Sequence, residues 1–467
     1  MTAGGAQDTD TFDVIVLGAG PAGENVAGRT AAGGLRTAVV ESELVGGECS
    51  YWACIPSKTL LRPGAVLAAA RRVRGAAGAV TGFADAKATF EQRDAAVSHY
   101  DDTGGADWVR GTGSELVRGH GRIVDERRVE VPGEQGSRLL TARRAVVVAT
   151  GSSAVIPPIP GVDTVDHWDS RKATSHSQVP GRLAIVGGGV VAVEMAQAWK
   201  WLGVAEVVLL VRGSRLLERE EPFAGEELAA AFAEQGIDVR FNVSVNSLRA
   251  VDTGTEIALN DGSSFVADEF LVATGRRPNT VGIGLDSIGL EAGKPIKVDD
   301  HLRAVDVSGS WLYAVGDVNG RSLLTHMGKY QARACADVIL GKDATAWADS
   351  NAVPAVVFTD PQVASVGLRL AAAKDKGINA RQLKVPLDSA AGASVNGDQK
   401  GTAQVVVDDE RRVIIGATFT GPDVAELLHS ATIAIVGEVP LERLWHAVPS
   451  FPTLSEVWLR LLEADGF

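Results

Sequence analysis

Two cysteines, Cys49 and Cys54, lie five positions apart in the segment GGECSYWACIPSK at 46–58. The chain has 467 residues and only three cysteines, so this pair holds most of its thiols. Such a pair could bind a metal, form a structural disulfide, or act as a redox couple. Zinc needs about four ligands, yet the sequence has no histidine pair at finger spacing, and a disulfide over so short a loop stabilises little. We therefore favour the redox couple.

A glycine-rich turn lies shortly before the cysteines. FDVIVL at 12–17 predicts a buried strand, GAGPAG follows it, a stretch with helical spacing comes next, and RTAVVES predicts a second strand. Gly18, Gly20 and Gly23 have the G-x-G-x-x-G spacing of a dinucleotide-binding βαβ unit, in which a pyrophosphate binds at the helix N-terminus. Glu41 ends the second strand, where it is placed to accept hydrogen bonds from a ribose.

The same order of elements returns later in the chain. RLAIVGGGVVAVEMAQAWKWLG predicts strand, turn and helix, and EVVLLVR predicts the following strand. Gly187 and Gly189 take the first two glycine positions, and Ala192 takes the third, where alanine is accepted. Two such units in one chain favour two dinucleotide sites.

The two units differ at the end of their second strand. Where the first has an acid, the second has apolar Leu210 and Val211, followed by Arg212 and Arg215. A carboxylate would repel a 2′-phosphate, whereas a guanidinium binds it, so this end favours NADPH, with NADH still possible. The alternative is a solvated basic turn.

The remaining elements predict the architecture. RRAVVVATG and EFLVATG read as the exits of the two units, and from about 350 the pattern changes to an antiparallel sheet with helices at 423–437 and 454–464. We predict an α/β protein with two Rossmann-like domains and a C-terminal α+β dimerisation domain. The expected boundaries are 1–150 for the first part of the FAD domain, 151–280 for the NAD(P) domain, 281–348 for the return to the FAD domain, and 349–467 for the dimerisation domain.

Charge and composition exclude several classes of partner. The net charge is −13, which argues against nucleic acid and an anionic membrane surface. No apolar run approaches the length of about 18 to 20 residues that spans a bilayer. The first ten residues are polar and acidic, unlike a signal peptide. We therefore expect a cytoplasmic protein, where a close cysteine pair is more often catalytic or metal-binding than structural.

Taken together, these motifs resemble those of the flavoprotein disulfide reductases, the pyridine nucleotide-disulfide oxidoreductases of the glutathione reductase, lipoamide dehydrogenase and mercuric reductase group. The segments that carry the resemblance span the chain in the family's order: GGECSYWACIPSK, ATGSSAVIPPIPG, GGGVVAVEMA, ATGRRPN, YAVGDV, FTDPQVASVGL and PTLSE. The resemblance implies FAD in the first unit, NAD(P)H in the second, and a homodimer formed by the C-terminal domain.

The resemblance also implies roles for single residues. Cys54 would lie against the flavin, and Cys49 would be the outer thiol that meets the substrate. Lys58 would lie near the reactive nitrogen of the flavin, paired with Glu194. Electrons would pass from NAD(P)H to the flavin, then to the Cys49–Cys54 disulfide, and finally to an acceptor.

Further cofactor contacts follow from the same resemblance. Asp317 would bind the flavin ribitol, the segment Leu324, Thr325 and His326 would run along the ring, and His120 with Gly121 would contact the adenine. The remaining expected cofactor-binding residues are Gly47, Thr150, Gly151 and Gly275.

One position departs from the family pattern. In members that reduce thiol substrates, a histidine precedes PTLSE and is oriented by the glutamate that ends it, but here Phe451 takes that place while Glu456 is retained. A phenyl ring cannot move a proton, and such acid–base help is worth about 10² to 10⁴ in rate. Either the acceptor needs no protonated leaving group, or another residue has taken over.

Three residues are candidates for that replacement. His446 lies five positions upstream of Phe451, Glu48 precedes Cys49, and Tyr51 lies between the cysteines. A histidine at such a place is more often a plain surface or core residue, and a carboxylate beside a thiolate would raise the pKa of the thiol.

Mercury is a weak candidate for the acceptor. Mercuric reductases carry a C-terminal cysteine pair, whereas this chain has no cysteine after Cys335, which is expected to pack in a helix core. We expect a small disulfide, a quinone-like acceptor, or a dithiol that is oxidised in the reverse direction, and no resident metal. The alternatives are an NAD(P)H:quinone-type or flavin reductase with idle cysteines, and a non-catalytic redox-sensing flavoprotein.

Overall fold

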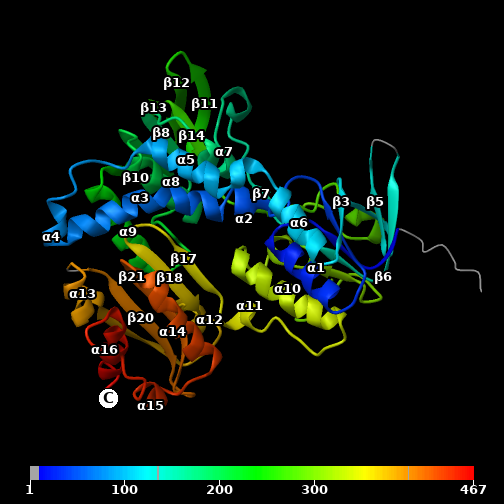
Figure 1. Ribbon diagram of the computed structural model, residues 1–467. Coiled ribbons are helices and arrows are strands. Elements are labelled where there is room, and N and C mark those ends of the chain that lie inside the picture. The colour runs from blue at the N-terminus through cyan, green and yellow to red at the C-terminus, as the bar shows by residue number, and fades with distance from the viewer. Residues whose placement is uncertain (1–9, 134–135, 398) are drawn as a thin grey trace, which may run out of the picture. The chain divides into compact units, whose positions relative to one another are not determined.

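The computed structural model describes residues 10–133, 136–397 and 399–467 (Figure 1). The chain forms two compact units. The first takes the chain as far as Cys54, together with Val97–Ser153 and Arg276–Asp349; the second takes Ile55–Ala96, Ala154–Gly275 and Ser350–Phe467. Three of these limits lie close to the predicted boundaries at 150, 280 and 348, while the division into four domains stays a prediction.

A seven-stranded sheet organises the first unit. Its centre is β1 (Thr11–Leu17), with parallel partners β2 (Thr37–Glu41) and β6 (Arg138–Val148). The other strands are β3 (Glu115–Arg118) and β16 (Leu312–Ala314), both parallel to their neighbours, and β4 (Arg122–Asp125) and β5 (Arg128–Val131), which are antiparallel. The strands predicted at 12–17 and after the first glycine turn are confirmed.

The strands of this sheet are buried on both faces. Val14, Ile15 and Val16 have no exposed surface, as expected for a parallel sheet covered by helices on each side. Figure 1 shows α1 (Pro21–Ala32) alongside α10 (Thr325–Ile339) in this unit. The shorter helices of this unit are α2 (Gly47–Tyr51), η1 (Ser98–Tyr100), α6 (Thr103–Gly111), η3 (Leu285–Ile288) and η4 (Gly316–Asn319).

The second unit contains a parallel sheet in the order β10-β9-β8-β14. Its strands are β8 (Arg182–Val186), β9 (Glu206–Val211), β10 (Ile237–Phe241) and β14 (Glu269–Val272). Its helices are α3 (Cys54–Arg72, whose first residue belongs to the first unit), α4 (Arg74–Ala77), α5 (Ala86–Ala96), α7 (Ser170–Ser175), α8 (Val190–Trp201) and α9 (Pro222–Glu234). A separate antiparallel sheet consists of β11 (Val245–Val251), β12 (Gly254–Leu259) and β13 (Ser264–Ala267).

The C-terminal part of this unit is the predicted antiparallel sheet, in the order β17-β18-β21-β20-β19. The strands are β17 (Pro354–Val357), β18 (Gln362–Gly367), β19 (Ala380–Pro386), β20 (Thr402–Asp408) and β21 (Val413–Gly421). The expected helix at 423–437 is α14 (Val424–Val436), and the one at 454–464 is a short turn η6 (Leu454–Glu456) followed by α16 (Val457–Glu463). The α+β character is confirmed.

Shorter elements complete the described chain. They are β7 (Ser152–Ala154), η2 (Val162–Thr164), β15 (Arg276–Pro278), α11 (Ala348–Asn351), α12 (Leu370–Asp375), η5 (Leu387–Ser389), α13 (Ala391–Val395) and α15 (Leu441–Leu444).

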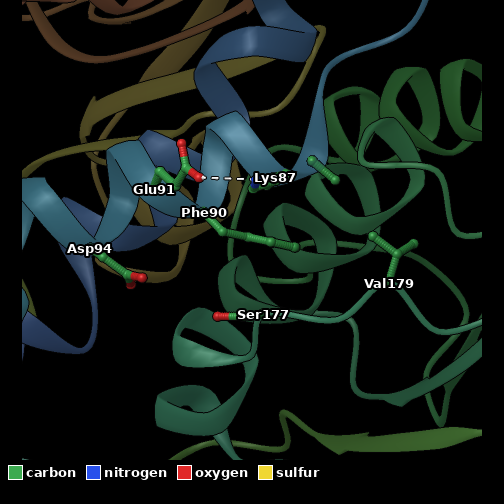
Figure 2. A pocket seen from close by; sticks show the side chains of 7 residues that line it. Lys87, Phe90, Glu91, Asp94, Ser177 and Val179 are labelled. Carbon is green, nitrogen blue, oxygen red and sulfur yellow. Dashed lines mark ion pairs between the residues drawn. The ribbon is translucent and has the colours of Figure 1, made fainter.

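A buried arginine on α5 fixes one side of the second unit. The Arg93 guanidinium has no exposed surface and donates to the carbonyls of Thr174 and His176 and, at 2.8 Å, to Ser177 Oγ. A cavity of about 400 Å³ opens beside this helix. Figure 2 shows its lining, which consists of Ala86, Lys87, Phe90, Glu91, Asp94, Ser177 and Val179.

Replacing Arg93 by methionine should destabilise the second unit by about 3 kcal/mol, because buried carbonyls would lose their donor. Thermal unfolding followed by circular dichroism should show a lower unfolding temperature. Lys87→Met on the same helix is the control, since the Lys87 side chain is 88% exposed. An unchanged unfolding temperature in Arg93→Met would show that this network adds nothing to stability.

Candidate functional site

The cysteine segment packs against the first glycine turn. Helix α2, which carries Cys49, begins after Gly46 at φ 115°, a conformation that favours glycine. Gly46 N donates to Ala19 O at 2.8 Å, and a Cβ on Gly47 would lie 2.9 Å from Gly20 Cα. The turn expected to bind a pyrophosphate and the segment expected to do redox chemistry are therefore in direct contact.

The two predicted redox cysteines lie together. Both are free cysteines. The pKa of Cys49 is raised mainly by its interaction with Cys54 and, to a smaller extent, by burial. Thr325 and the Lys329 ammonium oppose that rise. Cys54 Sγ lies 3.3 Å from Thr325 Oγ1, at the first residue of α10, where the helix dipole favours negative charge. The Thr325 hydroxyl and the helix N-terminus favour the negative charge on Cys54 and the proton on Cys49.

The predicted partner of Lys58 is also found. Lys58 Nζ donates to Glu194 Oε2 at 2.7 Å, although the two residues are 136 positions apart. The other carboxylate oxygen, Oε1, accepts from Phe358 N at 2.9 Å, and the Phe358 ring lies 5.0 Å from the lysine ammonium. The Glu194 side chain is only 4% exposed, so removing the lysine would leave a buried carboxylate without its partner.

The first glycine turn has room for a ligand. Gly18 has φ +99° and would clash with Ala149 O if it carried a Cβ, and a Cβ on Gly23 would lie 1.9 Å from Gly18 O. A Cβ on Gly20, by contrast, would meet nothing within 4 Å. Open space at the second glycine is what a closely approaching pyrophosphate requires. This turn therefore fits the FAD that the sequence predicts.

Glu41 holds the turn as well as ending β2. Its Oε2 accepts from Ala19 N at 2.6 Å, and its Oε1 accepts from Glu43 N at 2.7 Å. Each carboxylate oxygen keeps a further lone pair with which it can accept from a ribose hydroxyl.

Asp317 lies in a cluster that sequence reasoning missed in part. Ser152 Oγ donates to Asp317 Oδ2 at 2.5 Å, and Arg276 donates to Ser152 Oγ at 2.7 Å. Burial raises the pKa of Asp317, against the opposing effects of Ser152 and Arg276. Arg276 also lies 3.5 Å from Glu48, beside Cys49. The motifs ATGSS and GRRPN contain Ser152 and Arg276 and could have identified them.

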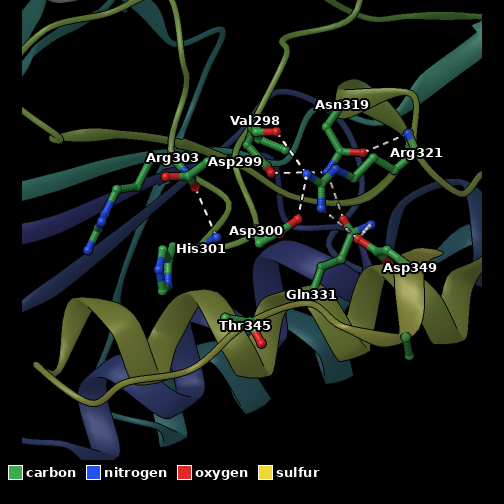
Figure 3. A network of polar contacts seen from close by, with 12 residues as sticks. Val298, Asp299, Asp300, His301, Arg303, Asn319, Arg321, Gln331, Thr345 and Asp349 are labelled. Atoms are coloured by element: carbon green, nitrogen blue, oxygen red, sulfur yellow. Dashed lines mark hydrogen bonds and ion pairs between the residues drawn. The ribbon is translucent and has the colours of Figure 1, made fainter. Parts of the chain in front are cut away.

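A polar network supports the turn that carries Asp317 (Figure 3). Gln331 Oε1 accepts from Gly316 N at 2.7 Å and from Asn319 Nδ2 at 2.8 Å. Gln331 Nε2 donates to Asp349 at 3.0 Å, and Arg321 pairs with the same carboxylate at 3.5 Å. Burial raises the pKa of Asp349. Helix α10 thus links the thiol contact at Thr325 to the expected ribitol site.

Other predicted cofactor residues lie in this unit. Thr150 Oγ1 donates to Asn279 O at 2.7 Å, and Asn279 N donates to Gly151 O at 2.9 Å. His120 Nε2 lies 3.2 Å from Gly282 O. Three predicted residues remain. Gly121 packs against Leu17 and Val40. Leu324 immediately precedes α10, and His326 is exposed on that helix.

The second glycine turn has the same geometry as the first. Gly187 has φ +133° and no room for a Cβ beside Ala273 O, whereas a Cβ on Gly189 would meet nothing within 4 Å. Ala192 is fully buried under the turn. This turn therefore fits a second dinucleotide, and Gly275 lies at the exit of β14, where its carbonyl accepts from Val155 N at 3.0 Å.

The end of β9 carries the predicted basic residues. Arg212 is exposed, and Arg215 donates to the carbonyl of Glu218 at 3.0 Å. Val211, where an acid would stand in a site for a free ribose, is buried.

Phe451 and Glu456 do not form a proton-transfer pair. The Phe451 side chain is 79% exposed. Glu456 is buried and its Oε1 accepts from Thr453 N at 3.0 Å, which caps η6. His446 is exposed, and Tyr51 donates its hydroxyl proton to Val45 O at 3.1 Å. The retention of Glu456 therefore has a structural explanation.

Within residues 10–133, 136–397 and 399–467, no group of three or more His, Cys, Asp or Glu residues could hold a metal. No helix in the same residues is long and apolar enough to cross a membrane. Cys335 is fully buried in α10, and burial raises the pKa of its thiol.

Comparison with known proteins gives matches over nearly the whole chain. Residues 12–332 match the pyridine nucleotide-disulphide oxidoreductase family, and residues 353–461 match the dimerisation domain of that family. The chain is 32% identical to the mercuric reductase of Staphylococcus aureus, over 95% of this chain and 81% of that protein. It is also 32% identical to the dihydrolipoyl dehydrogenase of Chlamydia muridarum, over 96% of each.

Solved structures show the same fold. The HOCl-induced flavoprotein disulfide reductase RclA of Escherichia coli, as its Cu(II) complex, superposes with a TM-score of 0.85 at 23% identity, covering 97% of this chain and 99% of that one. LpdA of Mycobacterium tuberculosis gives a TM-score of 0.85 at 24% identity, covering 96% and 98%.

Two glycine substitutions separate folding from cofactor binding in the first unit. Gly20→Ala should leave the unfolding temperature of the apoprotein unchanged but weaken flavin binding at least about tenfold, because its methyl group would occupy the open space. Gly23→Ala should disrupt the turn itself. Flavin absorbance per polypeptide after titration with FAD measures the effect, with Gly75→Ala in α4 as the control because it also has open space. Wild-type flavin affinity in Gly20→Ala would contradict the assignment.

Proposed function

The chain belongs to the pyridine nucleotide-disulphide oxidoreductases, which are FAD-dependent enzymes, and on this premise we propose that its Cys49–Cys54 pair carries electrons from NADPH to a small disulfide without help from an imidazole. The observation that carries the proposal is the thiol pair itself, with Cys54 beside Thr325 at the start of α10. The C-terminal part matches the dimerisation domain of the family, which supports a homodimer.

Residues of the first unit would hold FAD. The open space at Gly20 would admit its pyrophosphate, Glu41 would accept from its ribose, and Asp317 would accept from its ribitol. When bound, FAD supplies the two-electron chemistry that links a reduced nicotinamide to the disulfide.

The two sulfurs then have distinct tasks. Reduction breaks their S–S bond, with two electrons from NADPH, and leaves the pair with a proton on Cys49 and a charge stabilised by Thr325 and the helix dipole. Cys49 loses its proton and attacks the substrate disulfide, forming a mixed disulfide and releasing one thiolate, which takes up a proton. Cys54 attacks the Cys49 sulfur, which releases the second thiol and restores the disulfide. One disulfide, one NADPH and one proton give two thiols and NADP⁺.

The choice of NADPH depends on the second unit. Val211 stands where an acid would repel a 2′-phosphate. The exposed Arg212 can pair with the phosphate, and Arg215 lies three residues further along the chain. We further propose a cytoplasmic location, because a reducing compartment suits a thiol couple in a chain with three cysteines.

The acceptor is expected to differ from those of the mercuric reductases and dihydrolipoyl dehydrogenases that the chain resembles. Phe451 replaces the expected histidine, and Glu456 is engaged in capping η6. No cysteine follows Cys335 in this sequence, which favours an acceptor other than mercury. A small disulfide whose thiols reach Cys49 directly fits these residues best.

Serine at either cysteine tests the redox couple by stopped-flow absorbance. Cys49→Ser should show a long-wavelength thiolate–flavin band without any reductant, because Cys54 remains beside the flavin, and Cys54→Ser should lack it. Both should lose disulfide reduction by at least about a thousandfold, since neither can form the mixed-disulfide cycle. Cys335→Ala is the control. Wild-type disulfide turnover in either serine variant would refute the proposal. If neither the wild type nor the variants reduce disulfides while quinone turnover is the same in all of them, the cysteines are idle.

Alanine at Arg212 tests the coenzyme preference. Losing a charge-assisted contact with the 2′-phosphate should raise the KM for NADPH about tenfold or more and leave kcat/KM for NADH unchanged. Steady-state kinetics with both coenzymes measures this, and the exposed Arg219→Ala is the matched control. Equal losses with NADH and NADPH would count against a 2′-phosphate contact.

A further inference from the structure

The loop between β9 and α9 folds back onto the second glycine turn. The backbone N–H of Leu217 in this loop donates to Gly188 O at 2.9 Å, and Gly188 lies between the two glycines of that turn. Leu217 adopts φ 49°, in the left-handed region, and its side chain is buried. Such a conformation is uncommon for leucine, and residues of this kind cluster at ligand-binding sites. The loop is therefore held against the turn that fits a dinucleotide.

The residue after Leu217 returns a carboxylate to the end of β9. A Cβ on Gly213 would lie 1.7 Å from Glu218 Oε1, so this carboxylate occupies the space that a side chain at Gly213 would take. Gly213 directly follows Arg212, just beyond the last residue of β9, Val211. In a dinucleotide-binding unit, an acid at the end of the second strand accepts from the ribose 2′-hydroxyl. Val211 provides no such acid, and Glu218 brings one to this end of the strand from further along the chain.

Contacts from two sides hold the backbone of Glu218 in place. Its carbonyl accepts from Arg215 Nη2 at 3.0 Å and from Arg369 Nη1 at 3.2 Å. Leu370 N, next to Arg369 in the C-terminal part of the same unit, donates to Glu221 Oε1 at 2.7 Å. Arg215 therefore supports the loop, and the position of Glu218 is fixed before any ligand binds.

Two opposite charges remain available at the end of β9. The side chains of Arg212 and Glu218 are both exposed. Neither side chain makes a hydrogen bond or an ion pair with another residue in the described part of the chain. A guanidinium binds a phosphate, whereas a carboxylate repels a phosphate and accepts from a hydroxyl. The two side chains therefore favour different ligands at the same end of the strand.

We infer that Glu218 sets the coenzyme specificity together with Arg212, an inference that rests on the second dinucleotide site of the proposed function. NADPH gains a contact between its 2′-phosphate and Arg212 but meets the negative charge of Glu218. NADH has a 2′-hydroxyl that donates to the Glu218 carboxylate instead. The enzyme therefore discriminates weakly and accepts both coenzymes. Only binding is altered, and no bond forms or breaks at Glu218.

Binding of two adenosine nucleotides to the holoenzyme tests this role by isothermal titration calorimetry. Adenosine 2′,5′-bisphosphate carries the phosphate that distinguishes NADPH, and adenosine 5′-monophosphate carries the free hydroxyl of NADH. Neither contains a nicotinamide, so redox chemistry does not enter. Glu218→Gln should tighten binding of the bisphosphate about tenfold or more, because a negative charge beside the phosphate is removed. It should change binding of the monophosphate by less than about threefold, because the glutamine amide oxygen still accepts a hydrogen bond.

Alanine at the same position removes both the charge and the acceptor. Glu218→Ala should tighten binding of the bisphosphate as well, but it should weaken binding of the monophosphate about tenfold. Glu234→Gln is the matched control, because Glu234 is an exposed carboxyl at the last residue of α9 and the substitution removes the same charge. The unfolding temperature of each variant shows whether the fold is kept.

The inference is overturned if the ratio of the two dissociation constants is the same in Glu218→Gln as in the wild type, or if Glu234→Gln changes that ratio equally. It is also overturned if neither nucleotide binds the wild type. A failure of the proposed function looks different, because Cys49→Ser would then keep wild-type disulfide turnover while these binding ratios still change as expected.

Discussion

The contact between Cys54 Sγ and Thr325 Oγ1, which lie 3.3 Å apart at the start of α10, is the interaction on which the site depends. Two half-buried sulfurs so close together cannot both be charged at low cost, so one keeps the proton and the other is stabilised by its surroundings. Thr325 and the N-terminus of α10 supply that stabilisation to Cys54. The division of labour between an attacking and a resolving sulfur thus follows from where one proton is held.

Backbone geometry sets the second constraint. In each unit, the first glycine of the turn adopts a positive φ that few other residues tolerate, and the second leaves open space at the helix N-terminus. The cysteine segment packs on the first of these turns through Gly47, so any movement of the turn would also move the thiols. Helix α10 also contacts the thiols, through Thr325. Gln331 of the same helix and Asp349 form a network that holds the turn carrying Asp317.

Much of this could be predicted from the sequence. The strands of the two glycine units and the C-terminal sheet follow from the sequence pattern, and the pairing of Lys58 with Glu194, 136 positions apart, follows from the family resemblance. The polar network of Gln331, Asn319 and Asp349 could not be found in this way, because it arises from the packing of α10 against the turn that carries Asp317, which leaves no motif. Glu456 shows the converse, since a residue of a familiar motif caps a turn here.

The state of the two cysteines before and after NADPH tests the central claim most directly. Peptide mass mapping of the oxidised holoenzyme under denaturing alkylation should find Cys49 joined to Cys54, and one equivalent of NADPH under anaerobic conditions should convert both to alkylated thiols while Cys335 is labelled in either state. If both cysteines are already alkylated without NADPH, or if the disulfide persists after the flavin is reduced, the pair is not the redox couple of this enzyme.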